Sequence, residues 1–175
     1  MFHRVFFMNV FHRPFSPSHY RDAVSKSVNL SAWDQPVAVT LTMRQVLNDA
    51  NGGCLHLDHH QASANLSHFL KRLNRAFFGN AVRHGRRVNS FAVLEKTSEG
   101  RLHYHALIDR PQTVEREAFD SAVELCWSKT KWAQRQIDIQ HSANEGWLSY
   151  MLKARTKTNF YDDIDWTNAH LPSAD

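Results

Sequence analysis

The sequence predicts an α+β fold, in which a central, mostly antiparallel sheet has helices packed on one side. Three observations favour this class. Two strand-like segments, residues 89–96 and 102–108, flank a short turn and predict a hairpin. Three longer segments outside this hairpin carry helix signals, either capping residues or apolar residues at helical spacing. The 175 residues are enough for one domain with its own core.

The first predicted strand covers residues 36–43, PVAVTLTM, where β-branched and small residues alternate. A long helix is expected over residues 59–78, because Asp58 can cap its first turn and Gly79 stands where a C-cap belongs. Five apolar residues fall on one face of this helix and are expected to be buried: Leu66, Phe69, Leu70, Leu73 and Phe77.

The predicted hairpin uses residues 97–100 as its turn, and Pro111 ends its second strand. A second helix is expected to begin at Thr113 or a neighbour and to run through Trp127.

A further short strand is predicted at residues 136–140, QIDIQ, where apolar and polar residues alternate. The last helix is expected to open at Asn144 or Glu145 and to end near residue 157. We divide the single domain, residues 1–175, into three parts: an N-terminal extension at 1–35, a core at 36–157 and an acidic C-terminal tail at 158–175.

The charge distribution indicates an anionic partner. Lys and Arg total 21 against 17 Asp and Glu, a net charge of +4. From His59 to Leu94 the chain has no acidic residue, while its basic residues are frequent there. One face of the fold should therefore be basic. We expect the acidic residues to gather elsewhere, near residues 115–124 and 162–165.

Neither the cysteines nor the apolar residues suggest a secreted or membrane protein. The only two cysteines, Cys54 and Cys126, show no disulfide framework and fit a reducing cytoplasm. The aromatic N-terminal segment is interrupted by polar residues, so it predicts neither a membrane span nor a signal peptide. We expect a cytoplasmic protein, in a bacterial cell or a phage-infected host, with no membrane partner.

The segment RLHYHALID at residues 101–109 places two histidines inside an apolar strand. Residues i and i+2 of a strand share a face, so His103 and His105 project together while Tyr104 points to the opposite face. Two neutral imidazoles on one face are a natural pair of ligands for a divalent metal. The alternative is a pair of polar residues on a solvated sheet face.

Glu95 is a candidate third ligand from the partner strand. If the connection is the five residues 97–101, Glu95 faces His103 and Val93 faces His105. A connection of four residues would place Glu95 opposite Leu102, on the wrong face. A carboxylate oxygen suits Mg²⁺ or Mn²⁺, the ions expected at a site that handles phosphate. The alternative is an ordinary exposed charge at a strand end.

The last predicted helix supplies a possible nucleophile. Tyr150 and Lys153 are three residues apart and lie on one helix face. A tyrosine hydroxyl has an ordinary pKa of about 10 and is a poor nucleophile at neutral pH. A nearby ammonium group or metal ion would favour its anionic form or steady the charge on a phosphate.

These segments resemble three ordered motifs of the HUH endonucleases: VTLT at 39–42, LEKTSEGRLHYHALI at 94–108 and YMLK at 150–153. The resemblance spans about residues 36–157 and is to the single-tyrosine Rep branch, because the tyrosine follows the histidines here. That branch contains replication initiators of rolling-circle plasmids and small single-stranded DNA phages. The resemblance implies an HUH core like that of RRM domains.

The resemblance also implies an activity and its residues. It implies a metal site at His103 and His105 with Glu95, and Tyr150 as the nucleophile, with Lys153 orienting the phenolate or the phosphate. The implied reaction is sequence-specific nicking and joining of single-stranded DNA through a 5′-phosphotyrosyl intermediate, which initiates rolling-circle replication. A host polymerase and a helicase are implied partners, since the chain has no P-loop motif.

Two alternative functions stay open. One is a transposase that uses the same chemistry at the ends of a mobile element. The other is a non-catalytic binder of single-stranded nucleic acid on an RRM-like sheet, in which the two histidines would be surface polar groups and no metal would be needed.

Further residues are candidates for DNA contacts. Thr40 and Thr42 could turn their hydroxyls toward DNA or the metal site, or be ordinary strand residues. Basic residues in the long helix and the loop after it could neutralise phosphates: Lys71, Arg75, Arg83, Arg86 and Arg87. For the helix pair, the alternative is a solvated helix face. Three aromatic residues could stack bases but are expected in the core: Phe91, Trp127 and Trp132.

A second metal site is conceivable at residues 55–60, LHLDHH, where three histidines and Asp58 lie close in sequence. No cysteine pattern supports zinc there, and the segment spans a helix start. A capped helix with polar residues in its first turn is the favoured interpretation: Asp58, with His56, His59 and His60 around it.

Overall fold

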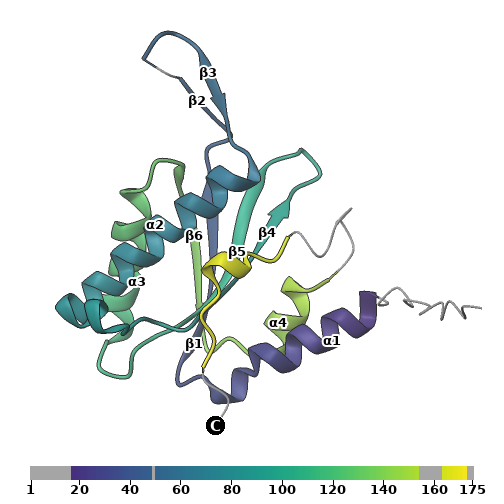
Figure 1. The fold of residues 1–175 in the computed structure, drawn as a ribbon, viewed down its shortest axis with the longest axis vertical. Coiled ribbons are helices and arrows are strands. Elements are labelled where there is room, and N and C mark those ends of the chain that lie inside the picture. Colours follow the sequence, from purple (N-terminus) through teal and green to yellow (C-terminus); the bar gives the residue numbers. More distant parts are fainter. Residues whose placement is uncertain (1–16, 49, 154–162, 173–175) are drawn as a thin grey trace, which may run out of the picture.

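The computed structural model describes residues 17–48, 50–153 and 163–172. Its centre is one antiparallel sheet of four strands in the order β4-β5-β1-β6 (Figure 1). The strands are β1 (Pro36–Met43), β4 (Ser90–Lys96), β5 (Leu102–Asp109) and β6 (Ala133–His141). The predicted α+β class is confirmed, and the last strand is longer than predicted because pairing with β1 continues to Ala133.

Helices cover both faces of the sheet, so the expectation of helices on one side was wrong. On one face, α2 (His59–Phe78) and α3 (Arg116–Ser128) enclose a core that includes Leu41 and Tyr104. On the other, α1 (Pro17–Val28) and α4 (Glu145–Met151) enclose a second core with Phe91 and Leu107. β4 is apolar on both of its faces, and each apolar face of a sheet needs its own covering layer.

The helix α2 begins and ends where the sequence predicts. The Asp58 carboxylate accepts a hydrogen bond from the backbone N–H of Gln61 at 2.7 Å, and the Gln61 side chain accepts one from the Asp58 N–H, forming a capping box. Gly79 is the C-cap, with a φ of 52°. Leu66, Phe69, Leu70 and Leu73 are buried as expected, and Phe77 is partly buried.

Two other helices differ from their predicted bounds. α3 begins at Arg116, three residues after Thr113, with Glu115 as its N-cap. α4 begins at Glu145 behind its N-cap Asn144, as predicted, but ends at Met151 instead of near residue 157. Residues 154–157 lie outside the described residues. None of the described helices is long and apolar enough to span a membrane.

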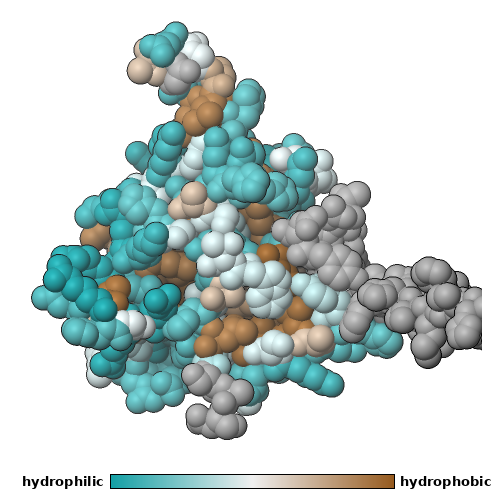
Figure 2. All heavy atoms as spheres, in the orientation of Figure 1, coloured by the Kyte–Doolittle hydropathy of each residue, from teal (hydrophilic) through white to brown (hydrophobic). Residues whose placement is uncertain are grey.

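A small hairpin of β2 (Val46–Asn48) and β3 (Cys54–His56) was not predicted. It stands away from the body of the molecule, with apolar atoms gathered at its base (Figures 1 and 2). Gln45 fixes that base to the sheet: its side-chain amide accepts a hydrogen bond from the Leu102 N–H at 2.8 Å and donates one to the Leu102 carbonyl at 3.0 Å.

Residues 163–172 lie along the outer edge of β4. Ser90 pairs with His170 and Val93 with Ile164 through isolated antiparallel bridges. Ile164 is buried in the second core, and α1, which lies in the predicted N-terminal extension, contributes Val24 and Val28 to the same core. The division into extension, core and acidic tail stays a prediction.

Candidate metal centre and nucleophile

The register of β4 and β5 places Glu95 directly opposite His103 and Val93 opposite His105. The predicted five-residue connection is confirmed. It is closed by a hydrogen bond from the Thr97 N–H to the Arg101 carbonyl at 2.9 Å, and Gly100 takes a φ of 83°, which favours glycine. The connection therefore brings the carboxylate and both imidazoles to one face of the sheet.

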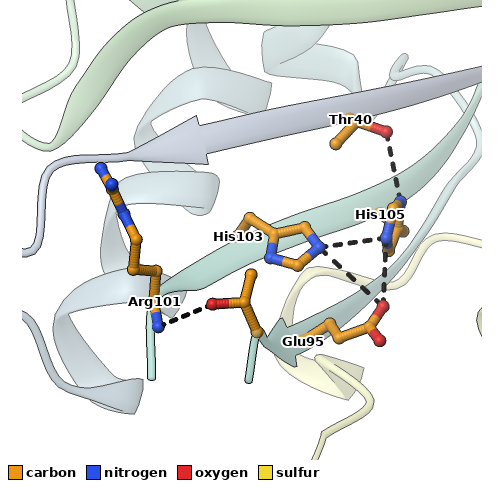
Figure 3. Close-up of polar contacts among 6 residues, drawn as sticks. Thr40, Glu95, Arg101, His103 and His105 are labelled. Atoms are coloured by element: carbon orange, nitrogen blue, oxygen red, sulfur yellow. Dashed lines mark hydrogen bonds and ion pairs between the residues drawn. The ribbon is translucent and has the colours of Figure 1, made fainter. Parts of the chain in front are cut away.

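The three side chains converge on a common point (Figure 3). His105 Nε2 lies 3.1 Å from Glu95 Oε2 and 3.1 Å from His103 Nε2. His103 Nε2 lies 3.9 Å from the same carboxylate oxygen. The side chains of His103 and His105 are only 16% and 9% exposed, so they are not surface groups on a solvated face. Glu95, at 26%, is the candidate ligand most open to solvent.

The donor set and its spacing fit a divalent cation. Ligand atoms about 2.1 Å from Mg²⁺ lie about 3.0 Å apart when they occupy adjacent corners of an octahedron. Two of the three observed distances are 3.1 Å, and one ligand atom from each residue lies within 4.8 Å of the others. Among the described residues this is the one group of three or more His, Cys, Asp or Glu that could hold a metal ion, so the segment at 55–60 forms none.

Thr40 stands behind His105. It is the β1 residue paired with His105, and its hydroxyl lies 3.2 Å from His105 Nδ1. A cation on Nε2 would require the proton on Nδ1, which would then donate to the Thr40 hydroxyl and fix the tautomer and the ring orientation. Thr42, paired with His103, instead donates its hydroxyl hydrogen bond to the Gln136 carbonyl at 2.5 Å.

Tyr104 ties the strand that carries both histidines to the C-terminal segment from the opposite face. Its hydroxyl donates a 2.9 Å hydrogen bond to the buried carboxylate of Asp165, which also accepts from Ser63 and Asn168. Burial, together with the negative charge of Asp165, raises the pKa of Tyr104 well above its ordinary value. Tyr104 is therefore a neutral structural donor and no candidate for the nucleophile.

Tyr150 projects from α4 toward the candidate ligands. Its ring centroid lies 5.5 Å from that of His105, at 81°, and its side chain is 47% exposed. The Lys153 ammonium lies 5.4 Å from the centre of the Tyr150 ring. Leu148 and Met151 are buried in the second core and hold α4 against the sheet. The phenol thus stands beside the candidate metal centre while remaining open to a substrate.

The face that carries the candidate ligands is divided into two halves. The half under α1 and α4 is apolar and includes Ala38, Val93 and Leu107. The remaining half, on the ends of β1 and β6, is polar. A pocket of about 330 Å³ opens there beside the candidate ligands, lined by Thr42, Met43, Thr97, Arg101, Leu102, His103, Gln134 and Gln136. This uncovered polar surface adjoins the candidate metal centre and has room for a polar substrate.

The predicted basic residues are not brought to this centre. Lys71 and Arg75 are on α2, which packs on the opposite face of the sheet. Arg86 and Arg87 precede β4, and the β4 start is about 17 Å from Glu95 at ~3.3 Å per strand residue. Arg83 lies in the 3₁₀ helix just before them, and Arg86 stacks over the ring of Phe78 at 5.1 Å. Phe91, Trp127 and Trp132 are buried in the cores, as expected.

Two residues escaped the sequence prediction. Arg101 lines the pocket with His103, and the spacing of two between them was the signal that could have identified it. Asp165 supports the histidine-bearing strand from a position far along the chain, and no local pattern marks such a partner.

Comparison with known families gives one match. A family model for a replication-associated protein of the ORF2 type matches residues 36–159. No curated protein and no solved structure matches the chain. The matched range contains Glu95, both histidines, Tyr150 and Lys153, whereas α1 and residues 163–172 lie outside it.

Proposed function

Because this chain belongs to the ORF2-type family of replication-associated proteins, we propose that it nicks and rejoins single-stranded DNA to initiate rolling-circle replication. The observation that carries the proposal is the position of Tyr150. Its ring lies 5.5 Å from His105, a member of the candidate ligand set, and its side chain is half exposed. A nucleophile for a phosphodiester needs this combination of access and nearness to a cation.

In the proposed reaction, Glu95, His103 and His105 would hold a Mg²⁺ or Mn²⁺ ion that polarises the scissile phosphate. The Tyr150 oxygen attacks phosphorus and loses its proton. The bond from phosphorus to the 3′ oxygen of the preceding nucleotide breaks, and that oxygen takes up a proton as a free 3′ hydroxyl. Tyr150 remains joined to the 5′ phosphate, and Lys153, beside the ring, steadies the negative charge.

The covalent step stores the energy of the broken linkage, so a later 3′ hydroxyl can displace the tyrosine and close the strand. Among the described residues Tyr150 is the one tyrosine placed for attack. Tyr104 is buried and bonded to Asp165, and the Tyr20 hydroxyl lies 3.3 Å from Trp166 Nε1. Tyr161 lies outside the described residues.

The polar half of the candidate ligand face is the proposed path of the DNA strand. It offers Thr42, Gln136 and Arg101 next to His103. Arg83, Arg86 and Arg87, at the far end of β4, are proposed for phosphates that flank the nick. Lys71 and Arg75 lie behind the sheet and receive no part in the cleavage centre. A host helicase and polymerase, acting in the cytoplasm, would complete the reaction sequence.

The test is formation of a covalent adduct. Wild-type protein and Tyr150→Phe are incubated with Mn²⁺ and a randomised single-stranded DNA library, and the adducts are isolated and sequenced. Tyr20→Phe is the matched control. Adducts that require Tyr150 and yield one shared sequence support the proposal. Wild-type protein that binds the library without forming any adduct would refute it in favour of a non-catalytic binder. Adducts at element ends instead of an origin would indicate a transposase.

A further inference from the structure

Trp147 joins the candidate ligand His105 and the candidate nucleophile. It lies on α4 one turn before Tyr150, and its ring centroid is 5.5 Å from the Tyr150 ring at 81°. The same indole lies 6.3 Å from the His105 imidazole, tilted by 49°. Since His105 and Tyr150 also contact each other at 5.5 Å, the three rings form a closed triangle.

The phenol of Tyr150 has few other restraints. Its helix has only seven residues, Glu145–Met151, and the side chain is half exposed. Within the described parts of the chain its hydroxyl makes no hydrogen bond, and its remaining contact is the Lys153 ammonium near the ring. Edge-to-face packing of the rings is therefore what directs the phenol.

Trp147 itself is well anchored. It is partly buried against the second core, and its backbone N–H donates to the N-cap side chain of Asn144 at 3.3 Å. An anchored indole beside a half-exposed phenol restricts the rotamers that the phenol can adopt. The contact with His105 also places the indole against the ring whose nitrogen would hold the cation.

We propose that Trp147 is a positioning residue that directs the Tyr150 phenol toward the metal-side phosphate. This inference rests on the proposed function and deepens it. A misdirected nucleophile lowers the rate of attack without weakening the binding of either metal or DNA. A role as a base-stacking platform would do the reverse, since loss of a stacked base weakens DNA binding.

The experiment compares Trp147→Leu with Trp147→Phe, and uses Trp166→Leu, which removes an exposed indole elsewhere, as the control. We expect Trp147→Leu to lower the single-turnover cleavage rate at saturating DNA and Mn²⁺ by about tenfold or more. Its Kd values for Mn²⁺ and for single-stranded DNA should stay within about twofold of wild type, and Trp147→Phe should recover most of the rate. An unchanged rate, or weaker DNA binding with an unchanged saturated rate, overturns the proposal.

A second measurement does not depend on cleavage. In protein labelled with 3-fluorotyrosine, the Tyr150 ¹⁹F signal is assigned by its loss in Tyr150→Phe. Trp147→Leu should shift that signal and leave those of Tyr20 and Tyr104 in place, whereas an unmoved Tyr150 signal contradicts the contact. If wild-type protein forms no adduct, the proposed function fails, while this signal still decides whether Trp147 directs the phenol.

Discussion

The Tyr104 hydroxyl donates a 2.9 Å hydrogen bond to Asp165, which ties the strand between the two candidate metal ligands to a segment close to the C-terminal end. Tyr104 is 1% exposed and Asp165 8%, so neither group can exchange its partner for water. The face of β5 opposite the candidate metal centre is thereby held by a residue that follows the candidate nucleophile in sequence.

Removing the Asp165 carboxylate should destabilise the fold, because the buried Tyr104 hydroxyl would lose its acceptor. We expect Asp165→Ala to lower the free energy of unfolding by about 1–3 kcal/mol, measured by urea denaturation. The matched control is Asp22→Ala, which removes an exposed carboxylate on α1. Equal effects of the two substitutions would show that the buried hydrogen bond contributes nothing.

Glu95 is the one anionic member of the candidate ligand set. Glu95→Gln keeps the side-chain shape and removes the charge, so the affinity for Mn²⁺, measured by electron paramagnetic resonance, should fall about tenfold or more. Glu99→Gln, in the exposed turn of the same hairpin, should leave it unchanged. Wild-type affinity in Glu95→Gln would exclude the carboxylate as a ligand.

Thr40 and Thr42 provide a matched pair on one strand. Of the two, Thr40 contacts a candidate ligand imidazole, at 3.2 Å, while Thr42 bonds to the Gln136 carbonyl. Thr40→Val should weaken Mn²⁺ binding about tenfold, because His105 would lose the partner that sets its tautomer. Thr42→Val should have little effect on Mn²⁺ affinity. The reverse order would place the supporting contact at His103 instead.

Arg101 should contact a DNA phosphate if the strand crosses the pocket beside His103. Arg101→Ala is expected to reduce the slope of log Kd against log salt concentration by about 0.7, the value for one phosphate contact to a single strand. Lys71→Ala, behind the sheet, should leave the slope as it is in wild type. A larger change for Lys71 would move the DNA path to α2.

His170 should make the contact of residues 163–172 with β4 sensitive to acid. Burial, with a contribution from the positive charge of Arg87, lowers the pKa of His170. The unfolded chain, with an ordinary histidine pKa of about 6.5, then binds a proton more readily than the folded chain. The stability contributed by neutral His170 is present above that pH and is lost as pH falls from it toward the lower folded pKa.

His170→Gln should therefore lose less unfolding free energy than wild type between neutral and mildly acidic pH, measured by urea denaturation at each pH. Arg87→Gln should reduce the loss in part, because it removes the repelling charge. Parallel pH profiles for wild type and His170→Gln would contradict this assignment.

The sequence was most informative where the pattern was local. Strand alternation placed His103 and His105 on one face, and the length of one turn decided whether Glu95 joined them. The capping of α2 was equally visible, since Asp58 and Gln61 are three residues apart. Each of these relationships is set by backbone geometry within a few residues.

The second helical layer could not be predicted in the same way. Its apolar residues in α1, Tyr20, Val24 and Val28, recur every four positions, but so short a stripe does not say which surface it covers. The bond between Tyr104 and Asp165 and the ring contact of Trp147 with His105 depend on packing between distant segments. No pattern in the neighbouring sequence encodes them.

The five-residue connection between β4 and β5 has a consequence for folding. All three candidate ligands lie within one hairpin, so the cation-binding half depends on contacts of short sequence range, which form early. The candidate nucleophile arrives only when α4 docks onto the completed sheet. A partly folded chain would hold a cation without being able to cut, so cleavage competence is acquired only with the last long-range contacts of the fold.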